Sequence, residues 1–197
     1  LDGDTKTIRP SIVFASNAGT ACDDPNDLRN GRIRVIDGAG CANQYTITAY
    51  EVPGASPVAI GDLDRAADKR PEIVANAAGG GLVAFKFNAA ANRFDLLWHS
   101  REANGADSTW AGTLYRWTGP TIADVTGDGV PEVAMGTILH DATGLVIASN
   151  LGYRHLNGTG QIAVFADVDN DAQAEMVTGD GVWRYAAGTG WVKETYF

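Results

Sequence analysis

A cluster of acidic residues that recurs directly ahead of a short β-branched run constrains this sequence more than any other feature. The two most similar copies are Asp124-Val-Thr-Gly-Asp-Gly-Val-Pro-Glu132 and Asp167-Val-Asp-Asn-Asp-Ala-Gln-Ala-Glu175. Both place side-chain oxygens at positions 1, 3, 5 and 9, so alternate residues of a tight loop can point at one centre. Ca²⁺ takes about six to eight oxygen ligands, so both loops predict calcium sites. The side-chain ligands would be Asp124, Thr126, Asp128 and Glu132 in one loop, and Asp167, Asp169, Asp171 and Glu175 in the other.

Two further copies of the acidic loop are less regular. One carries two extra residues between its first and last acids, which places its third acid two positions late. The other stands at the start of the sequence, lacks an acid at position 1, and has Ser11 where the others have Glu. We predict calcium sites in these two loops as well, although fewer of their side-chain oxygens fall at positions 1, 3, 5 and 9. Their acidic ligands would be Asp62, Asp64, Asp68 and Glu72, and Asp2 and Asp4.

The excess of acidic over basic residues is consistent with carboxylates that serve as metal ligands. The chain has 24 acidic and 15 basic residues, a formal net charge of −9, and 13 of the acids lie in the four loops. No basic patch could neutralise a row of phosphates, so we exclude nucleic acid as a partner. No apolar stretch approaches the roughly 18 residues of a membrane span. The first residues are polar and acidic, unlike a signal peptide, so we expect a mature, trimmed or fragmentary chain.

The spacing of the loops predicts an architecture. Position 1 falls at residues 62, 124 and 167, which are 62 and 43 residues apart. Periods of about 40 to 60 residues filled by short strands are typical of propeller blades with about four strands each. The expected strands are residues 11–14, 32–36 and 45–50; 58–60, 72–75, 82–87 and 94–99; 121–123, 132–135, 137–140 and 146–149; and 162–165, 175–177, 182–185 and 192–196.

No segment shows a convincing period of 3.6 residues, so we predict an all-β chain. It would form a partial β-propeller of three full four-stranded blades and one blade without its first strand. The blade boundaries would be about 1–53, 54–116, 117–159 and 160–197. Because an unclosed ring leaves edge strands unpaired, further blades would come from the same parent chain or from another subunit.

Residues 119–134 and 164–177 resemble FG-GAP/VCBS repeats, a family that includes the propeller of integrin α subunits and many bacterial surface and secreted proteins. The resemblance implies a calcium-binding propeller, extracellular or on the cell surface, with a protein or glycan ligand bound at loops on one face. It also implies that the carbonyl groups of Val130 and Gln173 complete the two ligand sets. The competing EF-hand motif needs Gly at position 6, an acid at position 12 and flanking helices. In the two regular loops the last acid is at position 9, and strands are expected on both sides, so the EF-hand is not favoured.

The two cysteines, Cys22 and Cys41, leave two interpretations open. They could form a disulfide in an oxidising compartment, or they could be two unpaired buried thiols. Both fall in Gly/Asn/Asp-rich loops, which favours the disulfide.

Aromatic residues give the candidates for ligand binding. Trp110 and Tyr115 lie in the long loop 101–118, where an exposed ring could stack on a sugar or anchor a protein partner. A ring folded back onto the sheets is the alternative. Trp98, Trp183 and Trp191 lie in or beside expected strands, and we expect them to pack between blades.

A search for catalytic motifs finds no nucleophile elbow, zinc motif or phosphate-binding glycine loop. We therefore favour an extracellular, calcium-stabilised, non-catalytic module for adhesion, binding or assembly. A lectin-like, carbohydrate-binding propeller is the first alternative. The second is the propeller part of a polysaccharide lyase, because some polysaccharide lyases are built on calcium-rich propellers.

Overall fold

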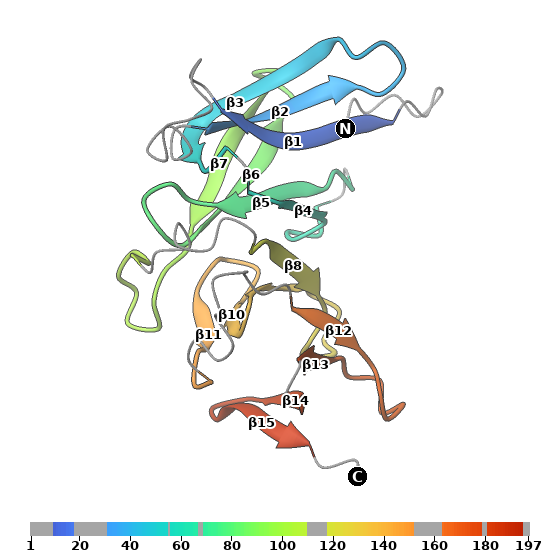
Figure 1. Ribbon diagram of the computed structural model, residues 1–197, viewed down its shortest axis with the longest axis vertical. Coiled ribbons are helices and arrows are strands. Elements are labelled where there is room, and N and C mark those ends of the chain that lie inside the picture. The colour runs from blue at the N-terminus through green and yellow to red at the C-terminus, as the bar shows by residue number, and fades with distance from the viewer. Residues whose placement is uncertain are drawn as a thin grey trace.

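The chain forms fifteen strands in four antiparallel sheets, seen in a computed structural model that describes residues 10–17, 31–54, 56–66, 69–109, 118–151, 163–178 and 181–194. No helix occurs among these residues, which confirms the all-β prediction. It follows that the described chain contains no helix that could cross a membrane. Figure 1 shows the sheets succeeding one another along the long axis, from the N-terminal to the C-terminal end.

The first sheet has three strands and the other three have four. The first contains β1 (Ser11–Asn17), β2 (Gly31–Asp37) and β3 (Asn43–Val52). The second contains β4 (Val58–Gly61), β5 (Glu72–Asn76), β6 (Leu82–Asn88) and β7 (Arg93–His99). The third contains β8 (Pro120–Ala123), β9 (Glu132–Met135), β10 (Ile138–His140) and β11 (Val146–Ala148). The fourth contains β12 (Val164–Ala166), β13 (Glu175–Thr178), β14 (Gly181–Ala186) and β15 (Gly190–Glu194).

Every sheet is a meander in which strands pair in sequence order. Among the described residues no strand pairs with the free edge of β1 in the first sheet, and Ile12 and Phe14 on β1 are exposed. Within the described residues the four sheets do not close a ring. The blade boundaries remain a prediction.

Buried side chains lie between successive sheets, so the inner sheets are covered on both faces. All five residues of β5 are buried. Ile73 and Ala75 pack in a cluster with Ile33 and Val35 of the first sheet, whereas Val74 packs in a separate cluster with β9 of the third sheet. Since successive residues of a strand point to opposite faces, a strand with both faces covered needs an unbroken apolar run. This is why β5 and β9 show no alternation of apolar and polar residues.

Tryptophans join the sheets by hydrogen bonds as well as by packing. The Trp98 indole nitrogen on β7 donates to the carbonyl oxygen of Ala142 in the third sheet at 2.9 Å. The Trp191 indole nitrogen on β15 donates to the carbonyl oxygen of Thr137 at 2.8 Å, and the ring packs in the cluster that joins the third and fourth sheets. Trp183 lies in the same cluster. The three tryptophans expected to pack between repeating units do contact the neighbouring sheets.

His140 is a fully buried histidine in β10, with Nδ1 at 3.1 Å from the Val133 carbonyl oxygen. Burial lowers its pKa from 6.5 to about 4, although the Val133 carbonyl and the nearby Asp141 carboxylate act in the opposite direction. The unfolded chain therefore binds a proton at a higher pH than the folded chain does.

We expect the free energy of unfolding to fall as pH decreases from about 6.5 to about 4, by about 3 kcal/mol from His140 alone. Stability from this group is complete above the ordinary histidine pKa and is lost as pH falls toward the lowered value. Denaturant titrations across this range, for the wild type and His140→Gln, would isolate the contribution as the difference between the two curves. Parallel curves would contradict the assignment.

Candidate metal centres

Three acidic loops occupy the same place in three sheets, between the first and second strands. They join β4 to β5, β8 to β9, and β12 to β13. Each second strand begins with the glutamate at the end of the acidic cluster. The three glutamates are buried: Glu72 is 1% exposed, Glu132 4% and Glu175 0%.

One oxygen of each glutamate caps its own loop. It accepts a hydrogen bond from the backbone N–H at position 2 of the loop, directly after the first acid. These donors are Leu63, Val125 and Val168, with N···O distances of 2.8, 2.8 and 2.9 Å. Because a buried carboxylate is stable only when it is hydrogen-bonded or paired with a charge, this bond ties the loop to the second strand.

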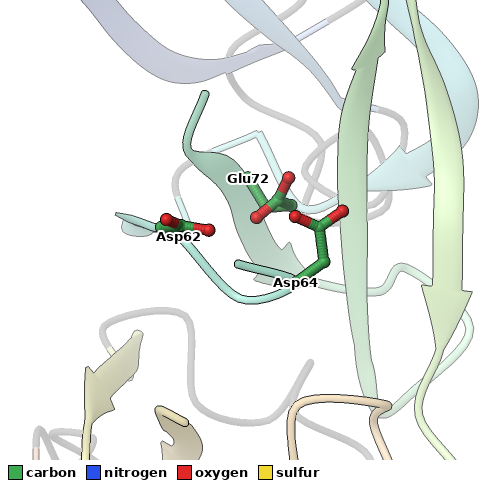
Figure 2. A group of neighbouring side chains, drawn as sticks. All are labelled: Asp62, Asp64 and Glu72. Atoms are coloured by element: carbon green, nitrogen blue, oxygen red, sulfur yellow. The ribbon is translucent and has the colours of Figure 1, made fainter. Parts of the chain in front are cut away.

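The second oxygen distinguishes two of the loops. In Glu72 and Glu175 this Oε1 atom is buried, and the protein offers it no hydrogen bond. Each of the two glutamates also shares a cluster with the acids at positions 1 and 3: Asp62 and Asp64 in one loop, Asp167 and Asp169 in the other. One carboxylate oxygen per residue lies within 4.8 Å of the others in its cluster. Figure 2 shows the Asp62, Asp64 and Glu72 side chains gathered in this way.

The spacing of these oxygens suits a calcium ion. Ligand oxygens lie about 2.3–2.6 Å from Ca²⁺, so two oxygens on one ion can be at most about 5 Å apart. Without a cation, three neighbouring carboxylates repel one another, and a buried oxygen without a partner pays its full desolvation cost. The Asp62 and Asp167 clusters could therefore each hold a metal ion, with calcium favoured by the all-oxygen ligand set.

The Asp124 loop differs at position 3. Both oxygens of Asp124 accept backbone N–H bonds from Gly127 and Gly129, each at 2.8 Å, and both oxygens of Asp167 accept such bonds in their own loop. At position 3 the Thr126 hydroxyl lies 3.3 Å from the Oε1 atom of Glu132, the oxygen that has no partner in the other two loops. Among the described residues this loop brings no three acids together. Calcium at Asp124, Thr126, Asp128, Val130 and Glu132 thus stays a prediction.

The acid at position 5 of the last loop also turns away from the predicted centre. One oxygen of Asp171 accepts the N–H of Gln173 at 2.8 Å, and the residue is absent from the Asp167 cluster. The amide of Gln173 reaches toward the carbonyl oxygen of Thr126, at 3.5 Å. The cluster therefore forms from positions 1, 3 and 9.

Burial raises the pKa of Glu72 and of Glu132, although the N–H bonds at position 2 act to lower both values. A bound cation would favour the charged form and reverse this effect. Protons and calcium therefore compete for these carboxyl groups.

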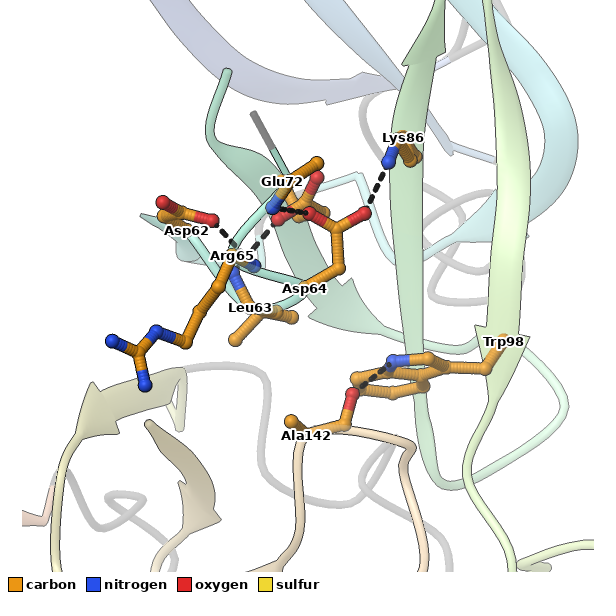
Figure 3. A network of polar contacts seen from close by, with 9 residues as sticks. Asp62, Leu63, Asp64, Arg65, Glu72, Lys86, Trp98 and Ala142 are labelled. Atoms are coloured by element: carbon orange, nitrogen blue, oxygen red, sulfur yellow. Dashed lines mark hydrogen bonds and ion pairs between the residues drawn. The ribbon is translucent and has the colours of Figure 1, made fainter. Parts of the chain in front are cut away.

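Lys86 on β6 supplies a positive charge to the Asp62 cluster. Its ammonium group forms an ion pair and hydrogen bond with Oδ2 of Asp64, as Figure 3 shows. Burial acts to raise the pKa of Asp64, but the bonds from Lys86 and from the Ala66 amide outweigh it, and this pKa lies below its usual range. Glu175 has no ion pair with any described residue. The sequence gives one signal for Lys86: it is the single charged residue in the strand Leu82–Asn88 and has apolar residues on both sides.

The remaining predicted site residues are placed only in part. Cys41 is exposed, which rules out its burial as a free thiol. The others lie outside the described residues, so the disulfide and the loop aromatics stay predictions: Asp2, Asp4, Cys22, Asp68, Trp110 and Tyr115.

Comparisons with known proteins find similarity in structure alone. No family model matches the chain, and no curated protein matches it. The crystal structure of the rhamnogalacturonan lyase YesW at 1.40 Å resolution matches over 92% of this chain and 34% of that one, with 18% identity and a TM-score of 0.52. A rhamnogalacturonan lyase PL11 of Bacillus licheniformis matches over 84% of this chain and 32% of that one, with 20% identity and a TM-score of 0.51. The chain thus shares its fold with about a third of each lyase.

Calcium is expected to raise the melting temperature, and a chelator to lower it. At a free Ca²⁺ concentration about 100 times Kd, each site would add about 2.7 kcal/mol to the free energy of unfolding. Glu175→Gln keeps an acceptor for the Val168 N–H but removes the charge, so we expect it to weaken calcium binding by at least about tenfold. Calorimetric titration would measure this, with Glu102→Gln as the matched control. Equal calcium affinity in both variants would contradict the Asp167 site.

Lys86→Met should strengthen calcium binding at the Asp62 cluster, because it removes the ammonium group that competes for Asp64. Without calcium the same variant should be less stable than the wild type, because three carboxylates lose their counter-charge. The comparison is made in a Glu175→Gln background, so that the Asp62 cluster dominates the titration. An unchanged calcium affinity would show that Lys86 does not occupy the place of the ion.

Proposed function

We propose that this chain is a segment of a calcium-stabilised β-propeller in a secreted protein related to polysaccharide lyases, and that the segment supplies polysaccharide-binding surface. The observation that carries the proposal is the likeness to two rhamnogalacturonan lyases over most of this chain. It supports the lyase-related alternative over the adhesion module, since neither similar structure is named as an adhesion protein.

The propeller part of the proposal is supported by the way the sheets repeat. Four meanders follow one another, and each packs face to face against the next. The first strands of the second and third sheets, β4 and β8, also contact each other. Radial blades meet in this manner along their innermost strands. The remaining blades would come from the rest of a longer protein, in keeping with the third of each lyase that this chain matches.

The metal centres have a structural role in this proposal. We infer that calcium at the Asp62 and Asp167 clusters holds the turn between the first two strands of a blade, in loops of the FG-GAP/VCBS type. This is supported by the glutamates that link each loop to its second strand. No catalytic residue is assigned, and the lyase activity of the similar structures is not carried over to this chain.

We expect the calcium-loaded chain to bind polysaccharide that contains galacturonate, and to release it when EGTA loosens the acidic loops. Affinity electrophoresis in gels with rhamnogalacturonan, and in gels with dextran as the neutral control, would measure this. A folded, calcium-loaded chain that migrates equally in both gels would contradict the proposal. Appearance of unsaturated sugar ends in the same mixture would assign lyase chemistry to this segment itself.

A further inference from the structure

A cavity of about 590 Å³ lies between the second and third sheets, next to the Asp62 cluster. Its volume is within the range of about 300–1,000 Å³ that is typical of small-molecule sites. The polar and aromatic residues in its wall are Asp64, Trp98, His99, Arg101, Asp107 and Thr143. Of these residues only Asp64 belongs to a predicted site, as a calcium ligand of the Asp62 cluster.

The aromatic wall of the cavity is held in place. The Trp98 indole nitrogen is bonded to the Ala142 carbonyl oxygen across the gap between the two sheets, as Figure 3 shows. The same ring lies against Gly144, which has φ +81°, and a Cβ atom there would be 2.7 Å from the indole. A rigid, half-buried indole offers an apolar surface for the C–H face of a sugar ring at little cost in conformational entropy.

Arg101 brings the positive charge. Its backbone is fixed to the third sheet, because its N–H donates to the Gly144 carbonyl oxygen and its own carbonyl accepts from Val146, both at 2.8 Å. Its side chain is exposed and forms no ion pair with any described residue. A guanidinium on a fixed backbone, without a carboxylate partner, suits bidentate binding of a ligand carboxylate.

His99 and Asp107 supply polar groups for hydroxyls. The His99 ring stacks on Tyr50, with centroids 5.3 Å apart, and its Nε2 atom lies 2.9 Å from the Gly80 carbonyl oxygen. Because that oxygen can only accept, Nε2 carries the proton in the neutral ring and Nδ1 is an acceptor. The Nδ1 atom is 4.0 Å from Oδ1 of Asp107, so two acceptors stand close together.

We propose that this cavity binds one uronate residue of an acidic polysaccharide. Trp98 packs against the sugar ring, Arg101 binds its carboxylate, and His99 and Asp107 accept hydrogen bonds from its hydroxyls. Asp64 and Asp107 make the cavity unsuitable for a multiply charged anion such as phosphate. The class of ligand rests on the proposed function above.

The test uses the calcium-loaded chain and a galacturonate oligosaccharide, titrated by calorimetry. Arg101→Gln is expected to weaken binding by at least about tenfold, because it removes the guanidinium group that would bind the sugar carboxylate through two hydrogen bonds. Arg93→Gln changes an exposed arginine of β7 that does not line the cavity, and it is expected to leave the affinity within about twofold. A galactose oligosaccharide, which has a neutral hydroxymethyl group in place of the carboxylate, should bind the wild type more weakly than the galacturonate does.

The outcomes separate the two proposals. If the wild type binds galacturonate but Arg101→Gln binds it equally well, or if the neutral sugar binds as tightly, this cavity is not the uronate site and the proposed function stands. If the wild type binds no galacturonate, both proposals fail. Gly144→Ala should also weaken binding, because a Cβ atom there would displace the Trp98 ring and the Gly144 carbonyl oxygen accepts from the Arg101 N–H.

Discussion

The described structure depends on a buried carboxylate that begins the second strand of three sheets. Glu72, Glu132 and Glu175 each direct one oxygen to the N–H at position 2 of the preceding loop. A buried charge of this kind would destabilise the sheet if the loop did not provide donors and a counter-charge. The loop and the strand are therefore stable only together. The surroundings of the three glutamates differ: Lys86 pairs with Asp64 beside Glu72, the Thr126 hydroxyl lies next to Glu132, and Glu175 itself has no ion pair with a described residue.

The second constraint is that the inner sheets have no solvent-facing side. Val74 packs toward the third sheet while its neighbours Ile73 and Ala75 pack toward the first. Such sheets cannot be amphipathic, and they bury polar groups only where a bond is available, as at the indole nitrogens of Trp98 and Trp191. The stack is thus held by apolar packing over its faces and by a few directional bonds at its edges.

Much of this architecture follows from the sequence because it depends on local patterns. Unbroken apolar runs beside acidic loops locate strands such as β5 and β9, and the absence of a helical period identifies the fold class. Exact ends were harder to predict: β3 extends over Asn43–Val52, beyond the expected 45–50, because pairing with β2 continues past irregularities in the register.

The sites were predictable in part for the same reason. The first, second and last acids of the predicted ligand sets lie close together in two loops: Asp62, Asp64 and Glu72 at positions 1, 3 and 11, and Asp167, Asp169 and Glu175 at positions 1, 3 and 9. The difference at the Asp124 loop follows from Thr126 at position 3, whose hydroxyl is hydrogen-bonded to Glu132, and loop spacing alone does not predict that bond. Lys86 is 22 residues from its partner Asp64 in the sequence, and Ala142 is 44 residues from the Trp98 indole that it accepts from. Such partners are fixed by strand register and sheet packing, which a motif does not contain.

The lysine beside Asp64 gives the second sheet a positive charge at its acidic turn. In the absence of calcium its ammonium group pairs with Asp64, so the turn between β4 and β5 keeps a counter-charge. Amide protons of β4 and β5 should therefore stay protected from exchange when calcium is removed. In a compartment poor in calcium, the second sheet would still have its native fold at this turn.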